Sequence, residues 1–337
     1  MKKVLITGIN GFAASHLAQL LLEMKYEVHG THRVRSDMYR LHALGIYDQI
    51  KYHLIELTDS ISVYDVIKQV MPDQIYHLAA QDYVKSSWDS PHETFNTNVG
   101  GTINLFHAIK QCYPRITHPG YYWFNKGDAS IYLEFPKILV TSTSETYGMH
   151  LDKINEETLQ APLNPYGISK LTQDQLSRLY AQAYGIPTVV TRSFNVTGWG
   201  RNDPFVDSNF AIQIVKIEKG MQDPIIRHGN LKTRRTFYDV RDAVRGYFLA
   251  MESKFSKGDV FCFGSDKSTS IEELLHMLIN LSEVAIETEV DASRMRPIDT
   301  AEMRVDYSKA REFLGWKPVI PLEQSLTDLL NYWRERL

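Results

Sequence analysis

Short runs of β-branched and aliphatic residues alternate with amphipathic stretches from the N-terminus to about residue 192. The runs are expected to be strands, and the stretches between them repeat apolar positions every three to four residues, as surface helices do. This alternation is typical of βαβ units and predicts a doubly wound parallel sheet of the α/β class. The expected strands are 3–7, 26–31, 51–55, 74–79, 137–142 and 187–192, and the expected helices are 12–24, 60–70, 96–112 and 166–184.

Beyond Arg192 the alternation becomes irregular. We expect residues 1–192 to form one domain and residues 193–337 a smaller, mostly C-terminal α/β domain. The two are predicted to be intertwined, because about 236–263 should rejoin the first sheet. An aromatic-rich segment, 113–136, interrupts the pattern, and loops of this length are often functional. The later elements are expected to be helices at 207–219, from about Asp239, at 270–282 and at 322–336, with a strand at 259–263 and a basic segment at 229–235.

A glycine-rich turn directly follows the first expected strand. Gly8 permits a tight turn, and Gly11 lets the backbone approach a pyrophosphate. The helix that begins near Phe12 presents N–H groups and the positive end of its dipole to the same place. Ala14 takes the third, helix-packing position of this fingerprint. The turn therefore predicts a Rossmann-type dinucleotide site within residues 1–192.

The end of the second expected strand indicates which dinucleotide is bound. An enzyme that uses NAD would place Asp or Glu there to bind the ribose 2′-hydroxyl. This chain has Arg33 and Arg35 instead, and the next acid is Asp37. Two guanidinium groups suit a 2′-phosphate in charge and in geometry, which favours NADP. The alternative is that both are solvated surface arginines.

Two further patterns point to hydride chemistry. Tyr166 and Lys170 lie one turn apart if a helix begins at Pro165, and a nearby ammonium group favours the phenolate form of a tyrosine. Thr143 and Glu145 follow a buried strand, at the sheet edge where α/β enzymes bind their ligands. Thr143 is suited to bind a hydroxyl group, and Glu145 to take a proton from carbon. Alternatively, these residues only cap the strand and helix ends.

Composition limits the remaining possibilities. The chain has 37 basic and 40 acidic residues and a net charge of −3, which argues against a broad basic face for nucleic acid. The two cysteines have no metal-ligand spacing around them, so no metal site is expected. No signal peptide or membrane span is apparent, which predicts a cytoplasmic protein without a membrane partner.

Five motifs occur in an order and spacing that resemble the extended short-chain dehydrogenase/reductase superfamily, in particular its nucleotide-sugar epimerases and dehydratases. The resemblance covers nearly the whole chain. The motifs are Gly8-x-x-Gly11-Phe12, His77-Leu78-Ala79-Ala80-Gln81, Asn98-Val99-x-Gly101-Thr102, Ser142-Thr143-x-Glu145-x-Tyr147-Gly148 and Pro165-Tyr166-Gly167-x-Ser169-Lys170.

Within this superfamily the N-terminal half is similar to GDP-mannose 4,6-dehydratases, and the later segments to GDP-4-keto-6-deoxy-mannose reductases. Three residues depart from the pattern: Ala14 replaces the third glycine, Glu56 replaces an Asp that approaches the adenine, and Thr236 replaces another Asp. The resemblance implies a catalytic set of Thr143, Glu145, Tyr166 and Lys170. It implies NADP contacts from Gly8, Gly11, Phe12, Arg33, Arg35, Glu56, Leu57, Leu78, Ala79, Ala80, Tyr166 and Lys170, and substrate contacts from Ser144, Asn195, Arg235 and Arg296.

Several functions are compatible with these residues. The favoured one is an NADP-dependent 4,6-dehydratase of a nucleotide-diphosphate sugar, GDP-linked by the resemblance, because that reaction needs an acid such as Glu145 beside the tyrosine. An NADPH-dependent GDP-4-keto-6-deoxy-mannose reductase is the main alternative. A 4-epimerase or a catalytically silent NADP-binding module is less favoured. The helices at 96–112 and 166–184 carry subunit contacts in this superfamily, so we expect a homodimer or homotetramer.

Overall fold

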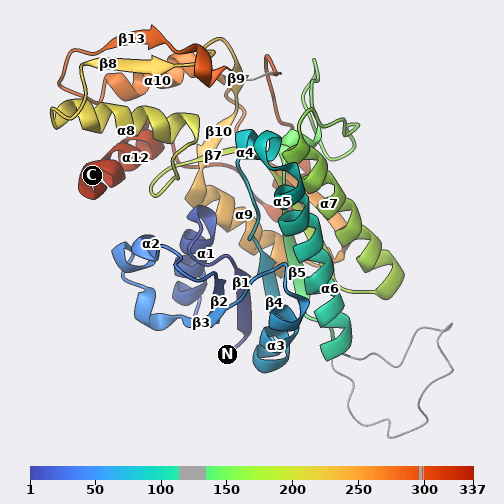
Figure 1. The fold of residues 1–337 in the computed structure, drawn as a ribbon. Helices are drawn as coiled ribbons and strands as arrows, with labels where there is room; N and C mark the ends of the chain where they lie inside the picture. The colour runs from blue at the N-terminus through green and yellow to red at the C-terminus, as the bar shows by residue number, and fades with distance from the viewer. Residues whose placement is uncertain (114–133, 296–297, 299) are drawn as a thin grey trace, which may run out of the picture.

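The computed structural model describes residues 1–113, 134–295, 298 and 300–337. Nearly all of the aromatic-rich segment 113–136, and Arg296 with it, lies outside these residues. A seven-stranded sheet forms the centre of the molecule, in the order β3-β2-β1-β4-β5-β6-β11, and all its neighbouring strands run parallel (Figure 1). The strands are β1 (Lys3–Thr7), β2 (Glu27–His32), β3 (Lys51–Leu54), β4 (Gln74–His77), β5 (Lys137–Thr143), β6 (Thr188–Ser193) and β11 (Lys257–Phe263).

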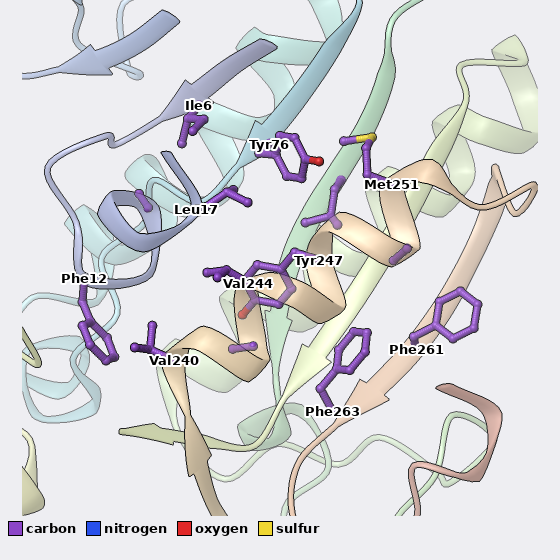
Figure 2. Packing of buried hydrophobic residues seen from close by; sticks show 14 of the residues in the cluster. Ile6, Phe12, Leu17, Tyr76, Val240, Val244, Tyr247, Met251, Phe261 and Phe263 are labelled. Carbon is purple, nitrogen blue, oxygen red and sulfur yellow. The ribbon is translucent and has the colours of Figure 1, made fainter. Parts of the chain in front are cut away.

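Helices cover both faces of this sheet, as the alternating pattern predicts. The central strands are buried on both sides, which is why Ile138, Leu139 and Val140 form a continuous apolar run with no exposed surface. On one face, the core residues Val244 and Tyr247 of α9 lie beside Leu17 of α1 and Tyr76 of β4 (Figure 2). The helices are α1 (Phe12–Glu23) and α9 (Val240–Glu252) on this face, and α3 (Ser60–Val70), α6 (Gly101–Cys112) and α7 (Pro165–Tyr184) on the other.

The helix expected at 96–112 begins earlier than the pattern indicates. α5 (Pro91–Phe95), a π-helical turn (Asn96–Gly100) and α6 follow one another without a break. The π turn places the side chain of Asn98 inside the protein, where it is fully buried. There it donates to the carbonyl oxygen of Gln81 (3.0 Å) and to Ser169 Oγ (2.9 Å), so it connects the segment after β4 to α7.

A second group of elements, which we call the C-terminal lobe, lies beyond the carboxyl ends of the strands (Figure 1). It has a hydrophobic cluster of its own, while β11 returns the chain to the edge of the main sheet. The lobe contains α8 (Val206–Glu218), α10 (Ile271–Ile279), α12 (Leu322–Arg336) and the parallel pair β8 (Ile225–His228) and β13 (Glu287–Val290). The remaining short elements are α2 (Tyr39–Ala43), α4 (Val84–Asp89), β7 (Asn195–Thr197), β9 (Arg234–Arg235), β10 (Phe237–Asp239), β12 (Thr269–Ser270) and α11 (Ser308–Leu314), of which α11 packs against β11 and α9.

Two further findings concern membrane-spanning helices and the two cysteines. Within the described ranges, none of the helices has the length and apolar character needed to cross a membrane. Cys112 and Cys262 are both free thiols. Burial raises the pKa of the Cys262 thiol, which lies 3.3 Å from the hydroxyl oxygen of Tyr147.

Candidate active site

A cleft of about 610 Å³ lies between the carboxyl edge of the sheet and the C-terminal lobe. Ligands of open α/β sheets bind at this edge, because the loops that leave the strands converge there. Glu145 lines the cleft from the sheet side. The lobe and its connections contribute further lining residues, among them Asn195, Arg201, Asn209, Phe210, His228, Arg235 and Arg294.

The glycine-rich turn has the geometry that a dinucleotide requires. Gly8 has a φ of +71°, and a Cβ there would lie 3.1 Å from the Cα of Ala79. Gly11 is the N-cap of α1 and has no side chain that could fill the space before the helix. The backbone N–H groups of Leu78 and Ala79 donate to Thr7 Oγ1, at 3.1 Å each, and hold the end of β4 against the turn. These residues therefore fit a pyrophosphate at the N-terminus of α1.

The other predicted cofactor residues differ in how far their side chains are buried. Ala80 continues the partly buried segment after β4. Glu56 is exposed just past the end of β3, whereas Leu57 is buried and accepts a hydrogen bond from Asn104 through its carbonyl oxygen (2.8 Å). The side chain of Phe12 is buried in the core, so only its backbone is placed to face a ligand at the helix terminus.

Arg33 and Arg35 lie in an exposed turn that follows β2. The turn is closed by hydrogen bonds between Arg33 and Ser36, from the Arg33 amide to Ser36 Oγ (3.1 Å) and from the Ser36 amide to the Arg33 carbonyl (3.2 Å). Asp37 accepts hydrogen bonds from the Tyr39 amide (2.9 Å) and from Arg336 of α12 (2.5 Å). These bonds hold the pKa of Asp37 below its usual value. The nearest acid in the turn is thus paired with an arginine from the far end of the chain.

The helix that carries Tyr166 is fixed to the acid Glu145 by Asn164. Asn164 is the N-cap of α7, and its Oδ1 accepts from the Gly167 amide at 2.7 Å. Its Nδ2 donates to Glu145 Oε2 at 2.8 Å. A Cβ on Gly167 would lie 2.6 Å from the carbonyl oxygen of Glu145, so only glycine allows this close approach. The sequence prediction missed Asn164, although Asn followed by Pro165 is a recognisable helix start.

Thr143 and Tyr166 meet where β5 ends against α7, and Lys170 follows one turn later on the same helix. A hydrogen bond from Thr143 to the Tyr166 phenol favours the phenolate, but burial dominates and raises the pKa of Tyr166 well above its usual value. The lowering of this pKa expected from the sequence is therefore outweighed in the structure. Burial also lowers the pKa of Lys170 to about 8, against the opposite effect of Asp82 and Asp174. Burial thus favours the uncharged form of each group relative to water.

Asp82 is a second acid of the site that the sequence prediction missed. It follows the motif at the end of β4, and its charge acts on both Tyr166 and Lys170. Its side chain is exposed at the surface, but the protein atoms packed around it displace water and raise its pKa. No local signal marked it, because its position beside α7 depends on the folded sheet.

Arg40 and Arg201 were missed for the same reason. Arg40 donates to the carbonyl oxygens of Gly200 (2.6 Å) and Asn10 (3.2 Å), and so ties the cofactor turn to the loop before α8. The Arg201 guanidinium lies 3.5 Å from the ring centre of Phe205 and lines the cleft. Its buried Nε has no hydrogen-bond partner among the described residues. A cationic side chain so placed suits an anionic ligand.

The predicted substrate residues are placed less uniformly. Asn195 and Arg235 line the cleft, and Arg235 also donates to the carbonyl oxygens of Arg234 (2.9 Å) and Thr300 (2.8 Å). Ser144 is buried in the turn between Thr143 and Glu145. Arg296 lies outside the described residues. In the part of the chain that the structure describes, no three His, Cys, Asp or Glu side chains gather as metal ligands would.

Comparisons with known proteins agree with this geometry. The family model described as GDP-mannose 4,6 dehydratase matches residues 5–329. The GDP-6-deoxy-D-mannose reductase of Pseudomonas aeruginosa is 29% identical, over 100% of this chain and 98% of its own. The human GDP-mannose 4,6 dehydratase is 27% identical, over 97% of this chain and 90% of its own. The solved structure of RMD from Pseudomonas aeruginosa complexed with NADPH superposes with a TM-score of 0.78, at 26% identity and with complete coverage of both chains. Because the family model spans almost the whole sequence, the chain belongs to the GDP-mannose 4,6-dehydratase family.

Proposed function

We propose that the protein is an NADP-dependent nucleotide-sugar 4,6-dehydratase that converts a GDP-mannose-like substrate to a 4-keto-6-deoxy sugar. The observation that carries the proposal is Glu145, which Asn164 holds at the start of the helix that bears Tyr166. A dehydratase needs a carboxylate in this position, because a proton must leave C5 before water can leave from C6.

The chain's own residues supply the proton transfers. NADP⁺, when bound, accepts a hydride from C4 and returns it at C6. Tyr166 takes the proton of the C4 hydroxyl, while Thr143 binds the same oxygen and Lys170 supplies positive charge nearby. The ketone at C4 acidifies C5, and Glu145 removes that proton. The C6 hydroxyl then leaves as water, taking a proton from Glu145. When the hydride returns to C6, the proton held by Tyr166 goes to C5, so both residues regain their starting protonation states.

NADP is the proposed cofactor on two grounds. The turn after β2 presents Arg33 and Arg35, and its acid Asp37 is paired with Arg336. The Pseudomonas aeruginosa structure with a similar fold and 26% identity was solved with NADPH. We propose the remaining cofactor contacts from the glycine-rich turn, Glu56, Leu57, the segment 78–80 and the Tyr166–Lys170 pair.

The substrate is proposed to bind in the cleft, with its diphosphate facing the C-terminal lobe. Arg235 and Arg201 line the cleft there, as does Asn195. Guanidinium groups bind phosphate oxygens well because they offer several N–H donors in one plane. We extend the predicted set, which includes Ser144 and Arg296, by Arg201. We further propose that 1–192 with the returning segment binds the cofactor and 193–337 the sugar nucleotide.

The second candidate is a 4-keto reductase. It is favoured by the Pseudomonas aeruginosa reductase, whose 29% identity covers the whole of this chain. A reductase would use Tyr166, Lys170 and Thr143 but would leave Glu145 without a required role. Epimerase chemistry and a silent binding module have less support, since neither accounts for Glu145.

One incubation separates the two candidates. The purified protein is mixed with GDP-mannose and a trace of NADP⁺, without another oxidant or reductant, and the products are analysed by mass spectrometry and NMR. A dehydratase yields a GDP-4-keto-6-deoxy sugar over many turnovers, because the hydride is returned in each cycle. Consumption of NADPH with a GDP-4-keto-6-deoxy sugar, together with no reaction of GDP-mannose, would establish the reductase instead.

We also propose that the protein is cytoplasmic and forms a homodimer or homotetramer through α6 and α7. Both helices expose apolar side chains, including Ile103 (41% exposed) and Leu179 (55%), which a partner subunit could cover. Light scattering at micromolar concentration should give at least twice the chain mass of 38.8 kDa. A monomer mass would contradict the proposed assembly.

A further inference from the structure

Lys170 has a hydrogen-bond partner on its own helix, one turn away. Its Nζ donates to Oε1 of Gln173 at 2.5 Å, and Gln173 Nε2 donates to Thr102 Oγ1 of α6 at 2.8 Å. The three residues are almost inaccessible, with 2%, 1% and 0% of their surface exposed. The ammonium group therefore meets a neutral amide, in a place that bulk water does not reach.

The orientation of this amide is determined by its neighbours. A lysine ammonium can only donate, so Gln173 must turn its oxygen toward Lys170 and its NH₂ group toward Thr102. The hydroxyl of Thr102 in turn donates to the carbonyl oxygen of Asn98 at 2.6 Å. Its lone pairs then accept from Gln173 and from the Nε2–H of His77, at 3.1 Å.

The same chain of hydrogen bonds continues to the cofactor turn. Burial lowers the pKa of His77 to about 3, so the imidazole is neutral and its Nδ1 accepts from the Thr7 hydroxyl at 2.9 Å. Thr7 directly precedes Gly8, and its Oγ1 accepts hydrogen bonds from the backbone N–H groups of Leu78 and Ala79. One uncharged network thus joins the proposed catalytic lysine to the strand ends that carry the proposed cofactor site.

We infer that Gln173 is a positioning residue, which fixes the Lys170 ammonium and supplies it with a neutral acceptor in place of a counter-charge. The inference rests on the proposed use of Lys170, which the dehydratase and the reductase share. The other charged or titratable groups whose charge interacts with Lys170 are Asp82 from the β4 loop, Asp174 from α7 and His77 from β4. Asp174 already pairs with Arg192, so its charge is largely compensated.

Two substitutions at this position should act in opposite directions. Gln173→Glu places a carboxylate beside Lys170 and should raise the pKa of the lysine by about one unit or more. Gln173→Leu removes the acceptor and should lower that pKa, because the buried ammonium is then less well solvated. Damage to the fold alone would not produce shifts of opposite sign.

The test is an NMR titration of protein whose lysines carry ¹³C at Cε, with the Lys170 signal assigned by its absence in Lys170→Met. This readout needs no turnover, so it stands even if the proposed reaction is wrong, which the GDP-mannose incubation tests separately. Gln175→Glu and Gln175→Leu are matched controls on the exposed side of α7 and should leave the Lys170 signal unchanged. A Lys170 pKa that is the same in all the Gln173 variants, or shifted in one direction by both, would overturn the inference.

Discussion

Two buried cations have partners on neighbouring residues of helix α7, and the surroundings of the two cations differ. Arg192 of β6 donates to the carboxylate of Asp174 at 2.7 Å and to the Tyr147 hydroxyl at 2.8 Å. The Asp174 charge overcomes the effect of burial and raises the pKa of Arg192. Lys170 meets the neutral amide of Gln173 instead, and burial lowers its pKa to about 8.

The difference shows that one helix holds both a residue that stabilises the fold and a residue that positions a proposed catalytic group. A buried ion pair fixes both protonation states, and it becomes costly as soon as one partner is lost. A buried cation with a neutral partner stays close to deprotonation, which is what acid–base catalysis near neutral pH requires. The neighbouring residues Gln173 and Asp174 therefore have separate tasks, one toward Lys170 and the other toward Arg192.

The largest effect is expected where the ion pair is broken. Asp174→Asn leaves Arg192 charged and buried, with both side chains at most 1% exposed in the native protein. The free energy of unfolding should fall by about 3–5 kcal/mol, measured by denaturant titration. Glu289→Gln removes an exposed pair with Arg227 and serves as the control, with an expected loss of about 1 kcal/mol or less. Equal losses in the two variants would remove the contrast between the buried cations.

Lys170→Met should affect activity rather than stability, in contrast to Asp174→Asn. Hydride transfer should slow by about 10² or more, whereas the unfolding free energy at pH 7 should not fall, because the buried ammonium that is removed forms no direct ion pair among the described residues. The pKa of Lys170 is lower in the folded than in the unfolded protein, so the unfolded state binds more protons between about pH 8 and 10.5. Wild-type stability should therefore rise relative to Lys170→Met as pH increases through this window. Lys137, whose pKa is also lowered to about 8, contributes equally to the stability of both proteins, so its contribution cancels when the variant's curve is subtracted from that of the wild type. A difference that stays flat with pH would contradict the neutral-partner interpretation.

Arg33 extends the comparison of the two buried cations to an exposed one, which is proposed to bind the cofactor phosphate. Arg33→Asp should weaken NADP⁺ binding by about tenfold or more and improve NAD⁺ binding relative to it, because a carboxylate would face the 2′-phosphate. Titration calorimetry with both dinucleotides measures this. Arg311→Asp makes the same charge change on α11, which packs beside β11 at the opposite edge of the sheet, and should leave both affinities unchanged. Unaltered NADP⁺ affinity in Arg33→Asp would mean that the turn after β2 does not bind the phosphate.

The sequence predicts the parts of the site that depend on local patterns but not the contacts between distant segments. The glycine-rich turn and the Tyr166–Lys170 pair are local patterns, in which spacing alone places the side chains. The groups that orient Gln173 are not local. Thr102 of α6 binds Gln173, and His77 of β4 binds Thr102, only in the folded protein. The pairing of β8 with β13, which are about 60 residues apart in the chain, was likewise not apparent, since both strands are short.

The measurement that tests the central claim is the reaction of Glu145→Gln. The amide can still accept the hydrogen bond from Asn164 Nδ2, so the geometry of the site is kept while the base is lost. Mixed with GDP-mannose and NADP⁺ in a stopped-flow instrument, this variant should form NADPH absorbance that persists, with product formation slower by about 10² or more. Tyr166→Phe should show no NADPH at all. If Glu145→Gln reduces a 4-keto sugar with NADPH at a near-normal rate, while the wild-type protein never dehydrates a hexose nucleotide, the dehydratase is contradicted and the reductase takes its place.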